Sequence, residues 1–284
     1  MIERSYLEAI RQGRTRPEDL ASIVIPHYRT EDLVRLCLRS IRRLTDHPYE
    51  AIVVDNHSAD GSLEYLRRVG WIRLIERGPE AGPDGVAAHA SAMDLGLAAA
   101  RGRWLVSLHS DTIVRRDGWL GDLLGRLRAA AGAACLGSGK FDADPPWYRA
   151  VKRLDPRRLW AGLRRLAGLG PPPAQPWPEW YPRTYCAIYD LACLRRLGLS
   201  FAATPGFAAG ERLYHGLLEA GHAAVRLTPQ EVAAYVDHVS HATALVARGG
   251  LGHWRGNHKV RRAIKRVMQT DLARRLLADP TLDA

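Results

Sequence analysis

A carboxylate that could hold a divalent cation follows an apolar stretch near the middle of the chain. The stretch covers residues 104–108, and His109, Ser110 and Asp111 come directly after it. A continuous run rich in Val and Leu is typical of a strand buried on both faces. The carboxyl ends of parallel strands open into the ligand crevice, where a carboxylate and substrate phosphates commonly hold a metal. Asp111 is therefore a candidate metal ligand; an ordinary turn, which Asp and Thr favour, is the alternative.

The elements ahead of Asp111 alternate between strands and helices. Buried strands are predicted at Ser22–Pro26, Ala51–Asp55 and Trp71–Glu76. Helices are predicted from Leu33 to Leu44 with a cap at Thr30, from Ser62 to Val69 and from Val86 to Ala100. Strand–helix–strand units of this spacing predict a parallel sheet.

The second half is less regular. A helix at 119–131 and a strand at 133–136 precede a segment rich in Pro, Trp and Arg at 141–182. This segment is expected to be an inserted, partly helical region. Its aromatic and cationic side chains could be exposed and stack on sugars or lie at a membrane interface; alternatively, the segment packs on the domain as a lid with its tryptophans buried. Further predictions are a strand at 184–189, a helix at 190–197, strands at 225–229 and 232–236, and a basic amphipathic helix at 257–277.

Composition narrows the class of protein. The 284 residues are 46% hydrophobic, which gives ample material for a globular core. No apolar run is long enough for a transmembrane helix, and the N-terminus lacks the form of a secretory signal. Four scattered cysteines argue against a zinc site or disulfide framework and for a reducing compartment. The net charge of 41 − 30 = +11 favours anionic partners, unless it only reflects an Arg-rich composition.

Four segments follow one another in a specific order: Ser22–Pro26, Leu36–Ile41, Ile52–Asn56 and Ser58–Ser62. Taken together they resemble the opening of family-2 glycosyltransferases. Asp94–Gly102 looks like the helix before their metal-binding strand, and Leu108–Asp111 stands where they carry the Asp-x-Asp motif. The resemblance covers residues 21–125 well and 183–243 more loosely.

The resemblance implies an α/β fold of the GT-A type, which binds nucleotide sugars. We expect a mixed, mainly parallel sheet flanked by helices, with a helical or irregular insertion and a C-terminal amphipathic helix. We expect a lead-in at 1–20, followed by a nucleotide-sugar-binding half at 21–140 and the insertion at 141–182. An acceptor-side half of the same domain at 183–245 and a basic helical tail at 246–284 complete the chain.

The same resemblance assigns roles to residues. It implies that Asp111 and His238 bind the metal, with His241 as the second choice for the histidine. It also implies that Glu211 is the general base, and Asp237 is the next candidate for that role. Asp55 would contact the nucleobase. The full set of expected donor-binding residues is Pro26, Tyr28, Asp55, Asn56, Gly82, Asp94, His109, Ser110 and Asp111.

Three positions depart from the family pattern. His109 replaces the first Asp of the motif, where it could hydrogen-bond the donor or merely fill space. Asp94 replaces an Asn, and Arg212 stands where a second acid follows Glu211. Glu211 could also be only a residue that favours a helix start.

The implied activity is inverting transfer of a sugar from a nucleotide-diphosphate sugar, with Mn²⁺ or Mg²⁺, to a carbohydrate or lipid-linked acceptor. The expected location is the cytoplasm, or the anionic inner face of the membrane, where a basic amphipathic helix can lie. No helix-turn-helix or zinc motif supports nucleic-acid binding. The alternatives are a nucleotidyltransferase, whose glycine-rich entry is missing after the first strand, and a catalytically degenerate nucleotide or sugar binder.

Overall fold

The computed structural model describes residues 19–81, 85–139, 180–202, 207–240, 242–247 and 254–284. Nearly all of the expected lead-in and most of the expected insertion therefore lie outside the described residues. Gly82 and His241 also lie outside them.

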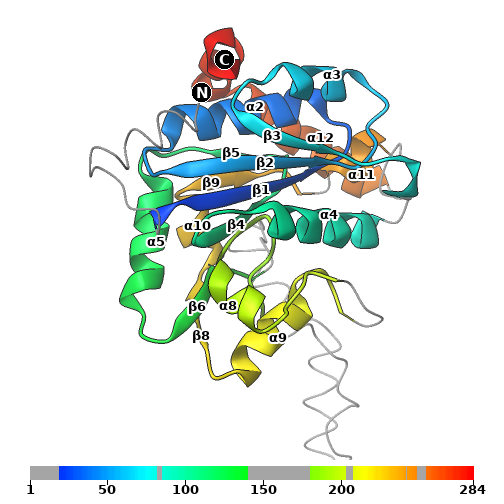
Figure 1. Cartoon of the computed structure of the whole chain (residues 1–284). Helices are drawn as coiled ribbons and strands as arrows, with labels where there is room; N and C mark the ends of the chain where they lie inside the picture. The colour runs from blue at the N-terminus through cyan, green and yellow to red at the C-terminus, as the bar shows by residue number, and fades with distance from the viewer. Residues whose placement is uncertain (1–18, 82–84, 140–179, 203–206, 241, 248–253) are drawn as a thin grey trace, which may run out of the picture.

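A seven-stranded sheet forms the centre of the molecule, in the order β3-β2-β1-β4-β7-β6-β8 (Figure 1). Its strands are β1 Ala21–His27, β2 Tyr49–Asp55, β3 Ile72–Glu76, β4 Trp104–Leu108, β6 Ala133–Ser138, β7 Cys186–Asp190 and β8 Ala223–Leu227. β3, β2, β1 and β4 run parallel, whereas β7 is antiparallel to both β4 and β6. β8 runs parallel to β6. The predicted mixed, mainly parallel α/β sheet is confirmed.

Helices cover both faces because alternate strand residues point to opposite sides. The helices of one face are α2 Glu31–Leu44, α3 Gly61–Arg68 and α5 Trp119–Ala129. Those of the other face are α4 Gly85–Ala99, α8 Leu191–Arg196 and α9 Glu211–Glu219. On β1, Ile23 and Ile25 join the first core while Val24 joins the second. Figure 1 shows α2 and α3 on one side of the sheet and α4 on the other.

Gly96 allows α4 to lie directly on β1. A Cβ at this position would come 2.1 Å from Cγ1 of Val24, so no larger residue fits without movement. This close approach fixes the height of α4 above the sheet and therefore the position of the side chains on its first turns.

A short ribbon outside the main sheet carries the chain beyond β4. β5 Thr112–Val114 pairs antiparallel with β9 Val236–His238. The predicted strand at 232–236 is wrong, because α10 occupies Pro229–Ala233 and β9 begins only at Val236. Thr228 and Glu231 form a capping box with Pro229 at the helix start, and this local signal outweighs the apolar alternation.

The C-terminal region contains several helices in place of the one helix predicted at 257–277. α11 Ala242–Ala247 is followed by α12 Trp254–Met268, α13 Asp271–Leu277 and a 3-10 turn, η3, at Pro280–Asp283. The break falls at Thr270, whose side chain caps α13 by accepting the N–H of Ala273. Together with Leu33, Leu36 and Ile113, this region forms a third apolar cluster on the outer side of α2. None of the described helices combines the length and apolar character required to span a bilayer.

The last described residues are bound to the N-terminal half by polar contacts. Arg39, which is buried, donates from Nε and Nη2 to the two carboxylate oxygens of Asp283, at 2.9 and 2.6 Å. The hydroxyl of Tyr65 donates to the same carboxylate at 2.9 Å, and the indole N–H of Trp71 donates to the carbonyl of Leu282. These contacts fix η3 against α2 and α3.

Candidate active site

Polar residues gather where three parallel strands end. β1 ends at His27, β2 at Asp55 and β4 at Leu108. Because these strands are parallel, their carboxyl ends lie at one edge of the sheet, where open α/β sheets bind ligands. His27 pairs with Asp55 in the register, so the two side chains stand beside each other.

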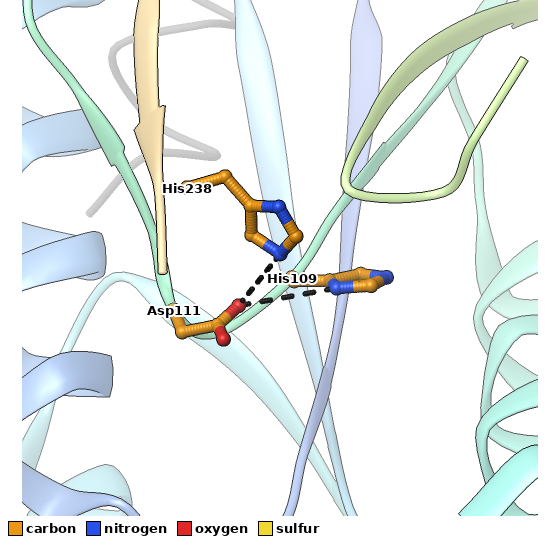
Figure 2. Close-up of side chains that lie close together, drawn as sticks. All are labelled: His109, Asp111 and His238. Carbon is orange, nitrogen blue, oxygen red and sulfur yellow. Dashed lines mark ion pairs between the residues drawn. The ribbon is translucent and has the colours of Figure 1, made fainter. Parts of the chain in front are cut away.

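A tight turn and a strand pairing bring three potential metal ligands together (Figure 2). The amide of Thr112 donates to the carbonyl of His109, which closes a turn around Asp111. Thr112 then pairs with His238 across the ribbon, and the amide of Val239 donates to the carbonyl of Asp111. Figure 2 shows both imidazoles directed at the carboxylate.

The geometry of this cluster suits a divalent cation. Oδ1 of Asp111 lies 3.3 Å from Nε2 of His238 and 3.9 Å from Nδ1 of His109. The ligand atoms of all three residues lie within 4.8 Å of one another. Two ligands each about 2.1 Å from one ion are about 3.0–3.4 Å apart at ordinary angles. The cluster therefore needs only a small contraction to surround a metal, and imidazole with carboxylate is a usual donor set.

His238 is held by its neighbours. The ring of Tyr185 stacks on it with centroids 4.7 Å apart and an interplanar angle of 5°. Ser240 Oγ lies 3.3 Å from Nδ1 of His238, which is not the ring nitrogen that faces Asp111. The backbone carbonyl of Tyr185 in turn accepts the hydroxyl of Thr112. These contacts fix the ring so that Nε2 is directed at the carboxylate.

Two residues at the cluster had no signal in the sequence. His89, on the first turns of α4, packs edge-on against His109 with ring centroids 4.8 Å apart. Thr184, just before β7, places Oγ1 3.0 Å from Nε2 of both His89 and His109. Burial lowers the pKa of His89 to about 4, and burial with the neighbouring imidazoles lowers the pKa of His109 well below its usual value. Both rings are therefore neutral at pH 7, the state in which imidazole binds metals.

Asp55 presents a carboxylate oxygen at the end of β2. Its side chain is fully buried, and Oδ2 accepts the amide N–H of Ser58 at 2.8 Å. Among the described residues no donor bonds Oδ1, and Nε2 of His27 lies 4.0 Å away. Burial lowers the pKa of His27 to about 4, so its ring does not neutralise Asp55 at pH 7. The next residue, Asn56, accepts a hydrogen bond at Oδ1 from the guanidinium of Arg77, at 2.6 Å.

The loop after β1 carries backbone strain. Pro26 lies within the strand opposite Val54, and Tyr28 is the first residue after the strand. Arg29 and Thr30 have φ values of 48° and 92°, which non-glycine residues rarely adopt. The predicted cap is wrong in its mechanism: Thr30 occupies the N-cap position of α2, but its side chain makes no capping hydrogen bond, because the residue is left-handed. Strained backbone of this kind clusters at ligand sites.

Glu211 begins α9 with its side chain buried. Oε2 accepts the amide of Ala208 at 3.0 Å, whereas Oε1 has no hydrogen-bond partner within the part of the chain that the structure describes. The preceding Gly210 lies against Thr184, since a Cβ on it would be 3.6 Å from Cγ2 of Thr184. Through Thr184, the start of α9 is therefore next to the His109 end of the cluster.

The remaining candidates have the following places. Ser110 is buried in the turn before Asp111. Asp94 accepts the backbone N–H of Phe201 at 2.6 Å and thus joins α4 to the segment leading toward α9. Asp237 forms an ion pair with Arg115 at 3.2 Å. Successive strand residues point to opposite faces, so Asp237 is directed away from the His109–Asp111–His238 cluster.

A cavity of about 740 Å³ is lined by α9 and by residues of the segment 198–202. Its polar lining includes Ser200, Arg212, His215 and Glu219, and Phe207, which also lines it, has 42% of its surface exposed. Glu211 is not among the lining residues, but Arg212 follows it directly. None of the lining residues belongs to the His109–Asp111–His238 cluster, so the cavity is separate from that cluster, and it adjoins the helix that Glu211 begins.

A family model ties this arrangement to known proteins. The model of Glycosyl transferase family 2 matches residues 22–196, which is more than half of the chain. The matched region contains Asp55, His109 and Asp111, while Glu211 and His238 lie beyond it. No curated protein matches the sequence.

Solved structures share the fold at low identity. One is the mannosyltransferase PcManGT from Pyrobaculum calidifontis in complex with GDP-Man and Mn²⁺, with 18% identity, a TM-score of 0.52 and coverage of 98% of this chain and 86% of that one. Another is TarS 1–349 from S. aureus, with 16% identity, a TM-score of 0.50 and coverage of 90% and 68%. TarS 1–349 in complex with UDP-GlcNAc has the same identity and TM-score and coverage of 90% and 71%. The likeness shows a common fold.

Proposed function

The chain belongs to glycosyl transferase family 2, and from this premise we propose that it moves a sugar from a nucleotide-diphosphate sugar to an acceptor hydroxyl with inversion. The observation that carries the proposal is the His109–Asp111–His238 cluster, which lies at the same sheet edge as the carboxylate of Asp55. GDP-Man and UDP-GlcNAc in the complexes of the structural neighbours support this class of donor.

The donor would lie across the carboxyl ends of β1, β2 and β4. Asp55 would accept hydrogen bonds from the nucleobase through Oδ1, supported by Ser58 on its other oxygen. Pro26, Tyr28 and Asn56 would border the nucleoside. Gly82, Asp94 and Ser110 complete the proposed donor-binding set with the cluster residues.

Asp111 and His238 would hold a divalent cation, Mn²⁺ or Mg²⁺, beside the donor diphosphate. Such a cation supplies Lewis-acid stabilisation of negative charge on a leaving diphosphate. The protein's own part is to hold the ligands: the β5–β9 pairing positions them, and Tyr185 fixes the ring of His238.

Glu211 would take the proton from the acceptor hydroxyl. The acceptor oxygen then forms a bond to the anomeric carbon from the face opposite the diphosphate, and the bond to the diphosphate breaks. The proton remains on Glu211, and the nucleoside diphosphate leaves with the bonding electron pair. Burial of Glu211 and the hydrogen bond from Ala208 hold the carboxylate in place for this transfer.

The acceptor would be a carbohydrate or a lipid-linked sugar. The cavity beside α9 could receive part of it, with Phe207 offering an apolar face and Arg212 a cation for an acidic group. α12 exposes several cations that could meet an anionic membrane surface. These exposed residues are Lys259, Arg261, Arg262, Lys265 and Arg266.

A thermal-shift screen tests the donor class. GDP and UDP, each with and without Mn²⁺, should raise the melting temperature, and the matching nucleotide should do so most strongly with metal. Ligand at 100 times its dissociation constant adds about 2.7 kcal/mol to the unfolding free energy, which is easily detected. Slow hydrolysis of the matching nucleotide sugar would identify an enzyme. Binding without hydrolysis or transfer would support a degenerate binder, and no shift with any nucleotide diphosphate would refute the proposal.

A further inference from the structure

A third imidazole, that of His89, packs beside the His109–Asp111–His238 cluster, so that the rings of His89, His109 and His238 form a row. His109 packs edge-on against His89 on one side and His238 on the other, with ring centroids 4.8 and 5.1 Å apart. The hydroxyl of Thr184 lies between His89 and His109 and reaches Nε2 of each at 3.0 Å. His109 thus directs Nε2 at Thr184 and its other nitrogen, Nδ1, at Asp111.

Hydrogen-bond accounting links the proton positions of His89 and His109. A neutral imidazole has one donor and one acceptor nitrogen, and a Thr hydroxyl has one proton to donate. If His109 donates from Nε2 to Thr184, Thr184 can donate to Nε2 of His89, and both contacts become hydrogen bonds. If His89 donates instead, Thr184 can donate to Nε2 of His109, and the proton of His109 is then on Nδ1, so the Thr184 contacts alone accommodate both tautomers.

The contact of Nε2 with Thr184 leaves Nδ1 as the nitrogen of His109 that faces Asp111. Nδ1 lies 3.9 Å from Oδ1 of Asp111, beyond hydrogen-bond range, so no hydrogen bond between these two atoms has to break when a cation enters. With a cation beside Asp111, the favoured tautomer of His109 would carry its proton on Nε2, because that tautomer directs the Nδ1 lone pair at the cation and still bonds Thr184.

We propose that His109 is a metal ligand through Nδ1, so that His109, Asp111 and His238 form a two-histidine, one-carboxylate site. Thr184 and His89 act as positioning residues: Thr184 accepts the Nε2 proton of His109 and donates to Nε2 of His89, which holds His109 with Nδ1 facing the cation. This inference rests on the proposed function, because it adds a third ligand to the metal site of the donor pocket.

The donor set changes which metals bind well. Mg²⁺ prefers oxygen ligands and octahedral geometry, whereas imidazole suits later first-row metals. A site with two nitrogens and one carboxylate should bind Mn²⁺, and Co²⁺ still more strongly, in preference to Mg²⁺. We expect the dissociation constant for Mn²⁺ or Co²⁺ to be at least about 10-fold lower than that for Mg²⁺.

Metal binding to the full chain tests the proposal without measuring catalysis. Protein freed of metal is titrated calorimetrically with Mg²⁺, Mn²⁺ and Co²⁺, each alone and with UDP or GDP. Pulsed electron paramagnetic resonance on the Mn²⁺ form then counts the coupled imidazole nitrogens. We expect two nitrogens in the wild type and one in His109→Ala, with Mn²⁺ affinity reduced by about 10–100-fold.

Two further variants separate ligation from positioning. His109→Asp should bind metal more tightly than His109→Ala does, and its selectivity should move from Mn²⁺ and Co²⁺ toward Mg²⁺. Thr184→Val removes the hydroxyl with little change of shape and should weaken Mn²⁺ binding by about 10-fold while both nitrogens remain coupled. His222→Ala, after α9 and outside the cluster, is the matched control and should behave as the wild type.

The outcomes distinguish this inference from the proposed function. If His109→Ala keeps wild-type affinity and two coupled nitrogens, His109 is not a ligand, while metal-supported nucleotide binding can still stand. If the wild type binds no metal with or without UDP or GDP, both proposals fail. If only the nucleotide class is wrong, the two-nitrogen signal with the metal alone remains.

Discussion

Oδ1 of Asp111 lies 3.3 Å from Nε2 of His238, although one residue precedes β5 and the other ends β9. The pairing of these two short strands holds the carboxylate and the imidazole in contact. One of the three candidate metal ligands, His238, therefore comes from a segment beyond the matched family region.

Asp111→Ala should abolish the effect of Mn²⁺ on UDP or GDP binding. The variant loses the only carboxylate of the three-residue cluster, while the neighbouring strands keep their backbone pairing. Calorimetry with and without Mn²⁺ measures this, and His238→Ala should weaken the metal effect less. A folded Asp111→Ala protein with unchanged metal-dependent affinity would remove Asp111 from the site.

Asp55→Asn should weaken binding of the nucleotide while the metal effect persists. Asn keeps an oxygen for the N–H of Ser58 but loses the charge. A hydrogen bond to a charged group contributes about 1.5–3 kcal/mol, so affinity should fall by about 10–150-fold. Glu50→Gln, on the same strand but outside the candidate site, is the control. Equal affinity for wild type and Asp55→Asn would contradict the nucleobase role.

Glu211→Gln should lower kcat by about 100–10,000-fold, because a general base accepts the proton in the transition state. Gln retains an oxygen that can accept the amide of Ala208, so the start of α9 should be preserved. Donor affinity should change little, since the residues proposed to bind the donor lie on other elements. Near-normal turnover with the true acceptor would reduce Glu211 to a residue that starts a helix.

Asp283→Asn should destabilise the fold in a pH-dependent manner. Burial opposes ionisation, but hydrogen bonds from Arg39 and Tyr65 outweigh it and lower the pKa of Asp283 below its usual value. A lowered pKa stabilises the fold above about pH 4, the unfolded value, and this contribution disappears as pH falls through the folded pKa. At pH 7 we expect a loss of about 1.5–3 kcal/mol.

Urea unfolding at several pH values checks the role of Asp283. The difference between wild type and Asp283→Asn should shrink below about pH 4. Asp271→Asn serves as the control, because Asp271 pairs with Arg274 on the surface and such pairs contribute little. A pH-independent difference between wild type and Asp283→Asn would show that packing, and not the ion pair, is responsible.

The basic face of α12 should bind anionic vesicles. Replacing Arg261, Arg262 and Lys265 by Gln should weaken co-sedimentation with phosphatidylserine vesicles by about 100-fold, at about 1 kcal/mol for each charge near the surface. A variant in which Arg67, Arg116 and Arg126 become Gln removes the same charge elsewhere and is the control. Equal loss in both variants, or equal binding to neutral vesicles, would contradict a membrane role for α12.

Strand ends were the most predictable part of this molecule. Buried runs that stop at Asp55 and just before Asp111 indicate a parallel sheet and a ligand edge from local pattern alone. The wrong strand at 232–236 had a readable signal against it, since Thr228, Pro229 and Glu231 are typical of a helix start. The split of the tail helix likewise had a signal in Thr270 and Asp271.

The imidazole row was not predictable from local pattern. His89 lies in an alanine-rich helix, and only the height of α4 above β1, set by Gly96, brings it to His109. Thr184 precedes an ordinary buried strand, and its hydroxyl becomes important because β7 lies next to β4. Such contacts depend on distances between elements, which a single sequence does not contain.

The ion pair between Arg39 and Asp283 also sets the earliest time at which the outer side of α2 can be buried during translation. The partners are 244 positions apart, and ribosomes add about 5–20 residues per second, so Arg39 is made roughly 12–50 s before Asp283. Burying the guanidinium without its carboxylate would cost several kcal/mol. The outer side of α2, including Leu33 and Leu36, must therefore remain open to solvent or chaperones until the segment that contains Asp283 has been translated.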